Sequence, residues 1–100
     1  MIREKKRYLQ LKINAPTQLD EEHAKHLIYA AVFEALGEHG ASKAGVQLKK
    51  FDFATQTAVV RCSNSLIEQA IAALALKRRQ DGKDVSIRLL KISGMIGKLG

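Results

Sequence analysis

Two histidines, one cysteine and a short acidic turn are the residues whose types and spacing could do chemistry. His23 and His26 lie three residues apart, so on a helix both imidazoles could reach one metal ion. Two histidines without a third ligand make a weak zinc site, and exposed histidines on a helix surface are far more common. The sequence therefore predicts no metal bound by the protein.

Cys62 is the single cysteine, and its alternation with Ala58 and Val60 predicts a small buried hydrophobe, not a nucleophile. One cysteine cannot form an intramolecular disulfide, which argues against a small secreted scaffold. Asp52 stands close to Thr55 and Gln56, but in a tight turn aspartate and threonine usually bond to the nearby backbone. Because no glycine-rich phosphate loop follows a strand, no catalytic residue is predicted.

The charge of the chain points to binding instead. Seventeen Lys and Arg residues against ten Asp and Glu residues give a net charge of +7 over 100 residues, which favours a nucleic-acid partner. No apolar stretch near the N-terminus resembles a signal peptide, and no run approaches the ~20 apolar residues of a membrane helix. We expect a cytoplasmic protein with no membrane partner; a soluble basic protein without a polyanionic ligand is the alternative.

The elements that must position these residues follow from the apolar spacing. Alternation predicts a strand over residues 7–13, ended by Pro16. Apolar residues at three- and four-residue spacing predict a helix that Asp20 caps, with Gly37 and Gly40 as two candidate ends. Two further strands, 46–52 and 57–63, are predicted to form a hairpin through residues 53–56.

The second half of the chain continues this order. Capping-box spacing over 65–68 and an apolar stripe over 67–74 predict a second helix, with the basic residues 77–79 at its negative end. A turn over 81–83 precedes a last strand over 84–92, and Ser93 could cap a short helix from Met95. The predicted fold is α+β, a ferredoxin-like βαββαβ domain over 1–100 that resembles an RNA-recognition module. Two helices would cover one face of a four-stranded antiparallel sheet and leave the other face open.

Strand parity predicts the side chains of this open face. Its predicted cations are Lys12, Lys49, Arg61 and Arg88, with no carboxylate beside them. The other predicted members are Tyr8, Gln10, Gln47, Thr57, Val59, Ser86 and Leu90. Such a face attracts phosphate in a salt-dependent manner. The alternative is that these cations only protect the strands from aggregation.

Aromatic side chains are scarce on the predicted face. RNA-recognition modules stack bases on aromatics of their two central strands, but here the third strand carries Val59 and Arg61, and only Tyr8 could stack. We therefore expect recognition of RNA shape and backbone, without sequence reading of single-stranded bases. A flexible basic arm, or alternatively a solvated charge run, is predicted for Arg3, Lys5, Lys6 and Arg7.

A separate candidate contact lies on the first helix. Phe33 falls roughly opposite the apolar stripe, with Tyr29 and His26 near it. A large aromatic residue on the outer side of a helix is a candidate protein interface. The alternative is that a terminal segment of the chain folds over it.

Four stretches of the sequence carry a resemblance to a known family. They are Arg7-Tyr8-Leu9, the hairpin from Phe51-Asp52 through Thr55-Gln56-Thr57 into Val59-Val60-Arg61-Cys62, then Gly82-Lys83, and Ser93-Gly94-Met95-Ile96. In these stretches the whole chain resembles the archaeal ribonuclease P protein component 2 family, which is shared with a eukaryotic subunit of ribonuclease P and its sister complex. The hairpin is the most specific of the four.

The resemblance implies a subunit of the ribonucleoprotein that removes the 5′ leader from precursor tRNA, in which the RNA is the catalyst and uses Mg²⁺. It also implies a barrel-shaped partner, ribonuclease P protein component 3, and allows a homodimer within a heterotetramer. On this view Lys12, Lys49, Arg61 and Arg88 neutralise crowded phosphates, which lowers the magnesium needed for cleavage.

Two rival functions stay open at this point. One is a protein-binding scaffold of another RNA-processing complex, with little direct RNA contact. The other is a small hydrolase or nuclease that acts alone, against which the lack of an active site argues.

Overall fold

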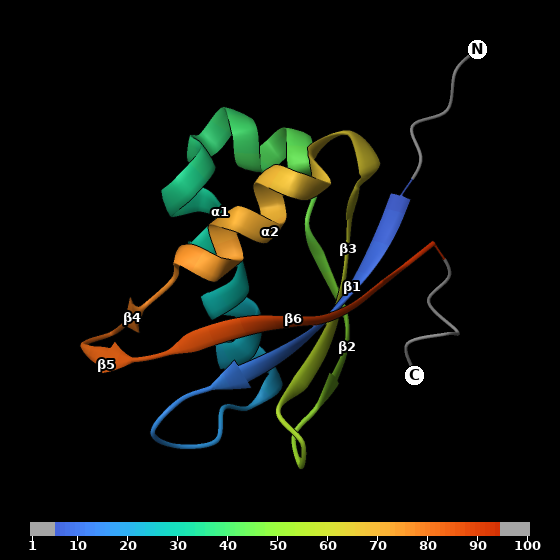
Figure 1. Ribbon diagram of the computed structural model, residues 1–100. Coiled ribbons are helices and arrows are strands. Elements are labelled where there is room, and N and C mark those ends of the chain that lie inside the picture. Colours follow the sequence, from blue (N-terminus) through green and yellow to red (C-terminus); the bar gives the residue numbers. More distant parts are fainter. Residues whose placement is uncertain (1–5, 95–100) are drawn as a thin grey trace.

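The computed structural model describes residues 6–94 of the chain. Strands β1 (Lys6–Asn14), β2 (Gln47–Asp52), β3 (Thr57–Ser63) and β6 (Ser86–Ser93) form one antiparallel sheet in the order β2-β3-β1-β6. Helices α1 (Glu21–Ala44) and α2 (Ile67–Leu76) cover one face of this sheet, and no described helix covers the other (Figure 1). The predicted α+β arrangement with one open face is confirmed; the helix predicted from Met95 lies outside the described residues.

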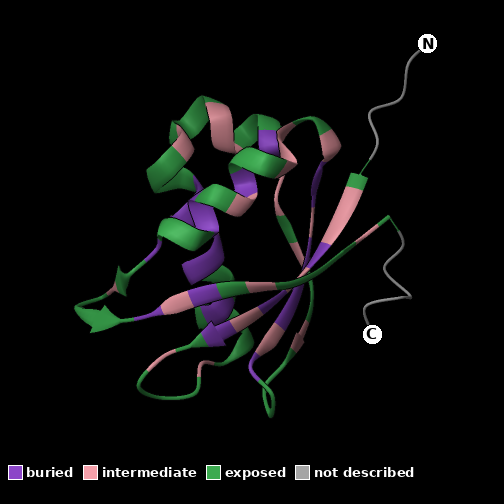
Figure 2. Cartoon of the chain, in the orientation of Figure 1, coloured by how far each residue is buried: buried purple, intermediate pink, exposed green. Residues whose placement is uncertain are grey.

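Strand β1 occupies the centre of the sheet, because it pairs with both β3 and β6. Its alternating residues Leu9, Leu11 and Ile13 are almost completely buried beneath the helices. Val60 and Cys62 of β3 complete this layer beside them. Buried residues accordingly concentrate in the central strands and on the inner sides of the helices (Figure 2).

Helix α1 begins as predicted but does not end as predicted. The carboxylate of Asp20 accepts a hydrogen bond from the backbone N–H of His23 at 2.8 Å, which is an N-cap. Gly37 has φ 75° and ψ 176°, so the helix bends there, and it ends only at Gly45, whose φ is 58°. Gly37 therefore interrupts the helix, as expected for one of its two predicted ends, but a second helical segment follows it, and Gly40 is not an end. The helix resumes after the bend because Ala44 packs into the core.

Helix α2 also starts differently from the capping-box prediction. A 3₁₀ turn (Asn64–Leu66) precedes it, the Ser65 hydroxyl pairs with that of Ser63 at 2.9 Å, and no side chain caps the first turn of α2. At its other end Lys77 is the C-cap residue, and its buried ammonium donates to both carboxylate oxygens of Glu34 on α1 at 2.9 Å. This ion pair ties the two helices together.

A small hairpin connects α2 to the last strand. Its strands are β4 (Arg79–Gln80) and β5 (Lys83–Asp84), and its two turn residues Asp81 and Gly82 have φ of 53° and 78°. Positive φ at both central residues is the type I′ turn that suits a two-residue hairpin, so the predicted turn is confirmed. Because Lys83 and Asp84 pair with β4, the last strand of the sheet begins at Ser86 and not at Asp84.

Candidate nucleic-acid interface

The open face of the sheet is built from three rows of side chains that run across β2, β3, β1 and β6. In that strand order the row at the hairpin end is Asp52, Thr57, Lys12 and Arg88. The middle row is Lys50, Val59, Gln10 and Lys91, and the third row is Gln47, Arg61, Tyr8 and Ser93. Neighbouring strands lie roughly 4.8 Å apart, so one row spans roughly 14 Å. This is the scale of a contact with a nucleic-acid backbone, not with a small ion.

Two bulges in the edge strands decide which lysines belong to this face. In β2 the pairing with β3 shifts between Leu48 and Lys50, which leaves Lys49 as the extra residue. In β6 the pairing with β1 shifts in the same way and leaves Leu90 as the extra residue. Beyond each bulge the side-chain parity is reversed. Lys50 and Lys91 therefore enter the middle row, one from each edge of the sheet.

The bulges correct two predicted members of the open face. Lys49 occupies no row; it lines a hollow on the helix side of β2 together with Lys25 and Tyr29 of α1. Leu90 is displaced from the rows by its bulge. Strict alternation was the reason for both errors, because it assumes that every residue of a strand has a partner.

The cations of the face differ in how they are held. The Arg61 guanidinium donates to the Gln47 side chain at 2.8 Å within the third row, and the Lys12 ammonium donates to the carbonyl of Thr55. Within residues 6–94, no group accepts a hydrogen bond from the side chains of Lys50, Arg88 or Lys91, and all three are exposed. These three cations are free to bind phosphate, whereas Arg61 and Lys12 already have partners.

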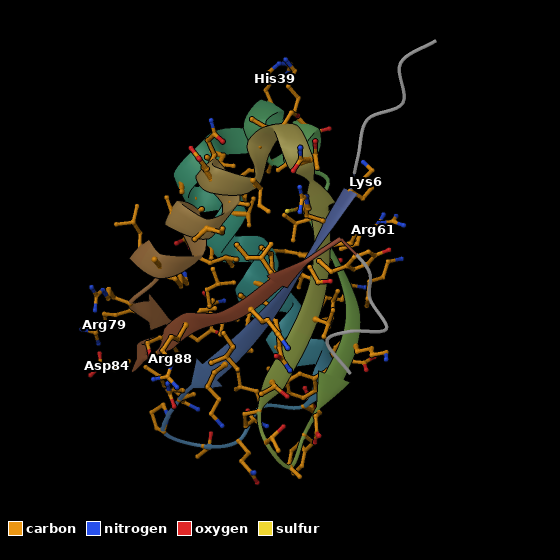
Figure 3. All side chains as sticks on the ribbon, turned by 45° about the vertical axis from the view of Figure 1, so that its right-hand side comes forward. Lys6, His39, Arg61, Arg79, Asp84 and Arg88 are labelled. Atoms are coloured by element: carbon orange, nitrogen blue, oxygen red, sulfur yellow. The ribbon has the colours of Figure 1, made fainter. Side chains whose placement is uncertain are left out.

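The remaining predicted basic residues lie at the other end of the sheet. Lys6 is the first residue of β1, so it does not belong to a free arm, and Figure 3 places it near Arg61 and far from Arg88. Arg7 shares the parity of Leu9 and donates from Nε to the Asn64 side chain at 2.9 Å, away from the open face. Lys5 and Arg3 lie outside the described residues.

One carboxylate does stand on the face, contrary to prediction. Asp52 ends the hairpin-end row, where its Oδ1 accepts from the backbone N–H groups of Ala54 and Thr55 at 3.0 and 3.4 Å. The prediction that Asp52 bonds its own turn is thus confirmed. Tyr8 is half-buried between Arg61 and Ser93, so its ring is part of the face.

The structure also brings together the three residues that were predicted to form a protein contact on α1. His26, Tyr29 and Phe33 line a hollow of about 530 Å³ with Ala41 and Val46, which follow the bend at Gly37; we call this the α1 hollow. Phe33 is 54% exposed, and the Tyr29 hydroxyl accepts a hydrogen bond from the backbone N–H of Leu48 at 3.3 Å. The sequence predicted an end of the helix at Gly37 but not the second helical segment beyond it, which contributes Ala41 to the α1 hollow.

In the described part of the chain, the cysteine and the histidines that could do chemistry do not form a catalytic or metal-binding site. Burial raises the pKa of the Cys62 thiol, which makes this residue a poor nucleophile at neutral pH. The ring of His23 pairs with Asp20 at 2.7 Å, and the described residues contain no cluster of three groups that could hold a metal ion. None of the described helices is long and apolar enough to cross a membrane.

Known proteins resemble this chain over nearly its whole length. The sequence model of the Rpp14/Pop5 family matches residues 7–99. The Ribonuclease P protein component 2 of Pyrococcus furiosus is 36% identical over 98% of this chain and 82% of its own length. That of Methanocaldococcus jannaschii is 38% identical over 97% of this chain and 71% of its own length. A chain in the cryo-EM structure of yeast Ribonuclease MRP has the same fold, with a TM-score of 0.71 at 15% identity, over 94% of this chain and 77% of that one.

Proposed function

The chain belongs to the Rpp14/Pop5 family, and we propose that it is a protein subunit of ribonuclease P that binds and stabilises the catalytic RNA. In this proposal the RNA removes the 5′ leader from precursor tRNA with Mg²⁺, and the protein contributes charge but no catalytic group. The observation that carries the proposal is a set of three cations, Lys50, Arg88 and Lys91, on a sheet face where residues 6–94 offer them no hydrogen-bond partner and no covering helix.

The mechanism is electrostatic. Lys50 and Lys91 lie at opposite ends of the middle row, with Val59 and Gln10 between them, so two phosphates of one RNA backbone could be held across the sheet. Each neutralised phosphate releases counterions, so affinity should fall with salt by roughly 0.7 to 0.9 logarithmic units per contact and per decade of salt. Neutralising crowded phosphates would stabilise compact RNA and reduce the magnesium that folding requires.

The α1 hollow supports a second contact, with a protein. Aromatic residues that are exposed beside a concave apolar surface are common anchors of protein interfaces. We assign this surface to ribonuclease P protein component 3. The assignment leaves the open face for RNA, and it is compatible with a homodimer within a heterotetramer. Phe33→Ser should weaken binding to component 3 about tenfold in a titration and leave RNA binding unchanged.

Reconstitution tests the main proposal. The RNA subunit is combined with this chain, with and without component 3, and cleavage of precursor tRNA is measured against Mg²⁺. The variant Lys50→Ala/Arg88→Ala/Lys91→Ala should require more magnesium than the wild type.

A matched control removes the same charge from elsewhere. Lys43, Arg78 and Lys83 are exposed and occupy no row of the open face, so Lys43→Ala/Arg78→Ala/Lys83→Ala should behave as the wild type. If the open-face variant supports cleavage at low magnesium as well as the wild type does, the proposal is wrong. Cleavage of precursor tRNA by the protein without RNA would contradict it as well.

A further inference from the structure

The hairpin end of the open face contains a hollow of about 520 Å³, within the size range of small-ligand sites. Its lining includes Gln10, Lys50, Asp52, Phe53 and Val59. We propose that this hollow binds one unstacked RNA nucleobase, with Phe53 as the stacking surface, Asp52 as the acceptor for an exocyclic amino group and Lys50 on the adjacent phosphate. The inference rests on the proposed RNA binding and adds base recognition to it.

The aromatic side chain of Phe53 is exposed to solvent, whereas its backbone is held in place by hydrogen bonds. Its side chain is 53% exposed at the tip of the β2–β3 hairpin. Its carbonyl accepts a hydrogen bond from the Gln56 amide at 2.8 Å and one from the Gln18 amide at 3.4 Å. The buried Gln56 side chain also binds both backbone groups of Leu19, at 2.9 and 3.0 Å. Because the backbone is already held, stacking of the exposed ring on a base requires only the side chain to be ordered, which limits the loss of conformational entropy.

The floor and walls of the hollow suit a base. Val59 is only 4% exposed and lies between Gln10 and Lys50, so it forms an apolar floor against the flat face of a ring. Asp52 uses Oδ1 for the turn, and its Oδ2 has no partner within residues 6–94. An ionised carboxylate only accepts hydrogen bonds, so it can bind the exocyclic amino groups of adenine, cytosine or guanine. Uracil has no amino group, and its ring N3–H lies between two carbonyl oxygens that repel the carboxylate, so uracil should bind less well.

Charge complementarity identifies the rest of the ligand as a nucleic acid. Lys50 stands in the middle row beside the hollow, and Lys12 and Arg88 extend the hairpin-end row away from it. A lone base would leave Lys50 and Arg88 without an anion, whereas an RNA strand supplies one phosphate per nucleotide. The expected ligand is therefore a single-stranded or bulged RNA segment that carries an amino-bearing base.

The test uses the full chain and labelled eight-nucleotide RNAs in fluorescence anisotropy titrations. Wild-type protein should bind oligo-A more tightly than oligo-U. Phe53→Ala should weaken oligo-A binding about tenfold without changing its salt dependence, because stacking releases no counterions. Asp52→Asn, which keeps an oxygen for the turn, should abolish the preference for oligo-A over oligo-U.

Leu76→Ala is the control, because Leu76 is a large exposed side chain at the end of α2 and belongs neither to the open face nor to the α1 hollow. It should leave both affinities unchanged. If Phe53→Ala binds oligo-A as the wild type does, the inference is overturned, and salt-dependent binding of a duplex RNA would still uphold the proposed function. If the wild type binds neither oligo-A nor the duplex RNA, both the inference and the proposed function are wrong. If Phe53→Ala instead converts a dimer into a monomer in sedimentation with unchanged oligo-A affinity, the hairpin is a self-association contact and the inference is wrong.

Discussion

Phe53 on the open face and Phe33 in the α1 hollow are exposed to nearly the same fraction, 53% and 54%. Their surroundings differ. Phe53 shares its hollow with Lys50 and Asp52, whereas apolar residues, among them Val32 and Val46, predominate around Phe33. The comparison teaches that exposure of an aromatic ring does not by itself identify a partner. The charge of its neighbours favours a nucleic acid in the first case and a protein in the second.

The two regions are also held in place by different interactions. The hairpin that carries Phe53 depends on the neutral, buried amide of Gln56. The part of α1 that carries Phe33 is tied to α2 by the ion pair between Glu34 and Lys77. Neutral networks are insensitive to salt, whereas ion pairs are screened by it. Variants of each region should therefore distinguish the RNA contact from the protein contact. They should also distinguish a neutral hydrogen-bond network from an ion pair as the interaction that holds the region in place.

The largest expected effect is on RNA affinity. Lys50→Ala/Arg88→Ala/Lys91→Ala should raise the dissociation constant for ribonuclease P RNA on the order of 30-fold at low salt, because up to three phosphate contacts are lost. The plot of log affinity against log salt should become less steep. Filter binding over a salt series measures both quantities. An equal loss of RNA affinity in Phe33→Ser would remove the distinction between the two regions.

The next effect is on the support of the hairpin. Gln56→Ala should lower the free energy of unfolding by about 2 kcal/mol, because it leaves both part-buried backbone groups of Leu19 without partners and removes the shorter of two hydrogen bonds to the Phe53 carbonyl. Urea unfolding checks this value. Gln18→Ala is the control: its exposed bond to Phe53 is long, at 3.4 Å, so a change within about 0.5 kcal/mol is expected. Equal losses in the two variants would show that the buried network is not the support.

The ion pair behind the α1 hollow should give a smaller and asymmetric effect. Glu34→Ala leaves the buried ammonium of Lys77 without its partner, so we expect a loss of about 1 to 2 kcal/mol. Lys77→Met keeps the aliphatic packing and leaves Glu34 largely in water, so we expect less than about 1 kcal/mol. Thermal unfolding of both variants decides the order, and the reverse order would contradict this account.

The smallest effect concerns the start of α1 and appears only in acid. The hydrogen bond from the backbone N–H of His23, followed by that from its side chain, lowers the pKa of Asp20. A lowered carboxyl pKa contributes stability above the unfolded value of about 3.9, and this contribution is lost as the pH falls through the lower folded value. Asp20→Asn keeps a good N-cap but should flatten the dependence of the melting temperature on pH below about 4. An unchanged acid profile in this variant would contradict the assignment.

Much of the fold could be predicted because it depends on local pattern. The alternation in β1, the hairpin after Asp52 and the turn at Asp81 all have short-range physical causes, and all are found in the structure. A break at Gly37 was among the predictions, but the second helical segment beyond it could not be predicted in the same way. A glycine permits a helix to end or to bend, and burial of Ala44 beyond it decided between the two.

The bulges left a trace in the sequence that strict alternation overlooked. Leu48 and Phe51 are three residues apart, and both are packed against the core, which a regular strand does not allow. Leu89 and Ile92 show the same interval in β6, where they pair with Leu11 and Leu9, although only Leu89 is packed against the core and Ile92 is 44% exposed. An odd interval between inward residues is therefore the signal that could have placed Lys50 and Lys91 on the open face.

The sequence by itself determined the order of the elements, the inward side of the central strand and the excess of positive charge, because these depend on spacing and composition. Only the tertiary structure decided which lysines lie together and that Phe53 borders a hollow. The physical reason is that side-chain parity is a local property, whereas a bulge depends on pairing with a neighbouring strand. The open face was predicted, and the pairing of its edge strands selected its free cations.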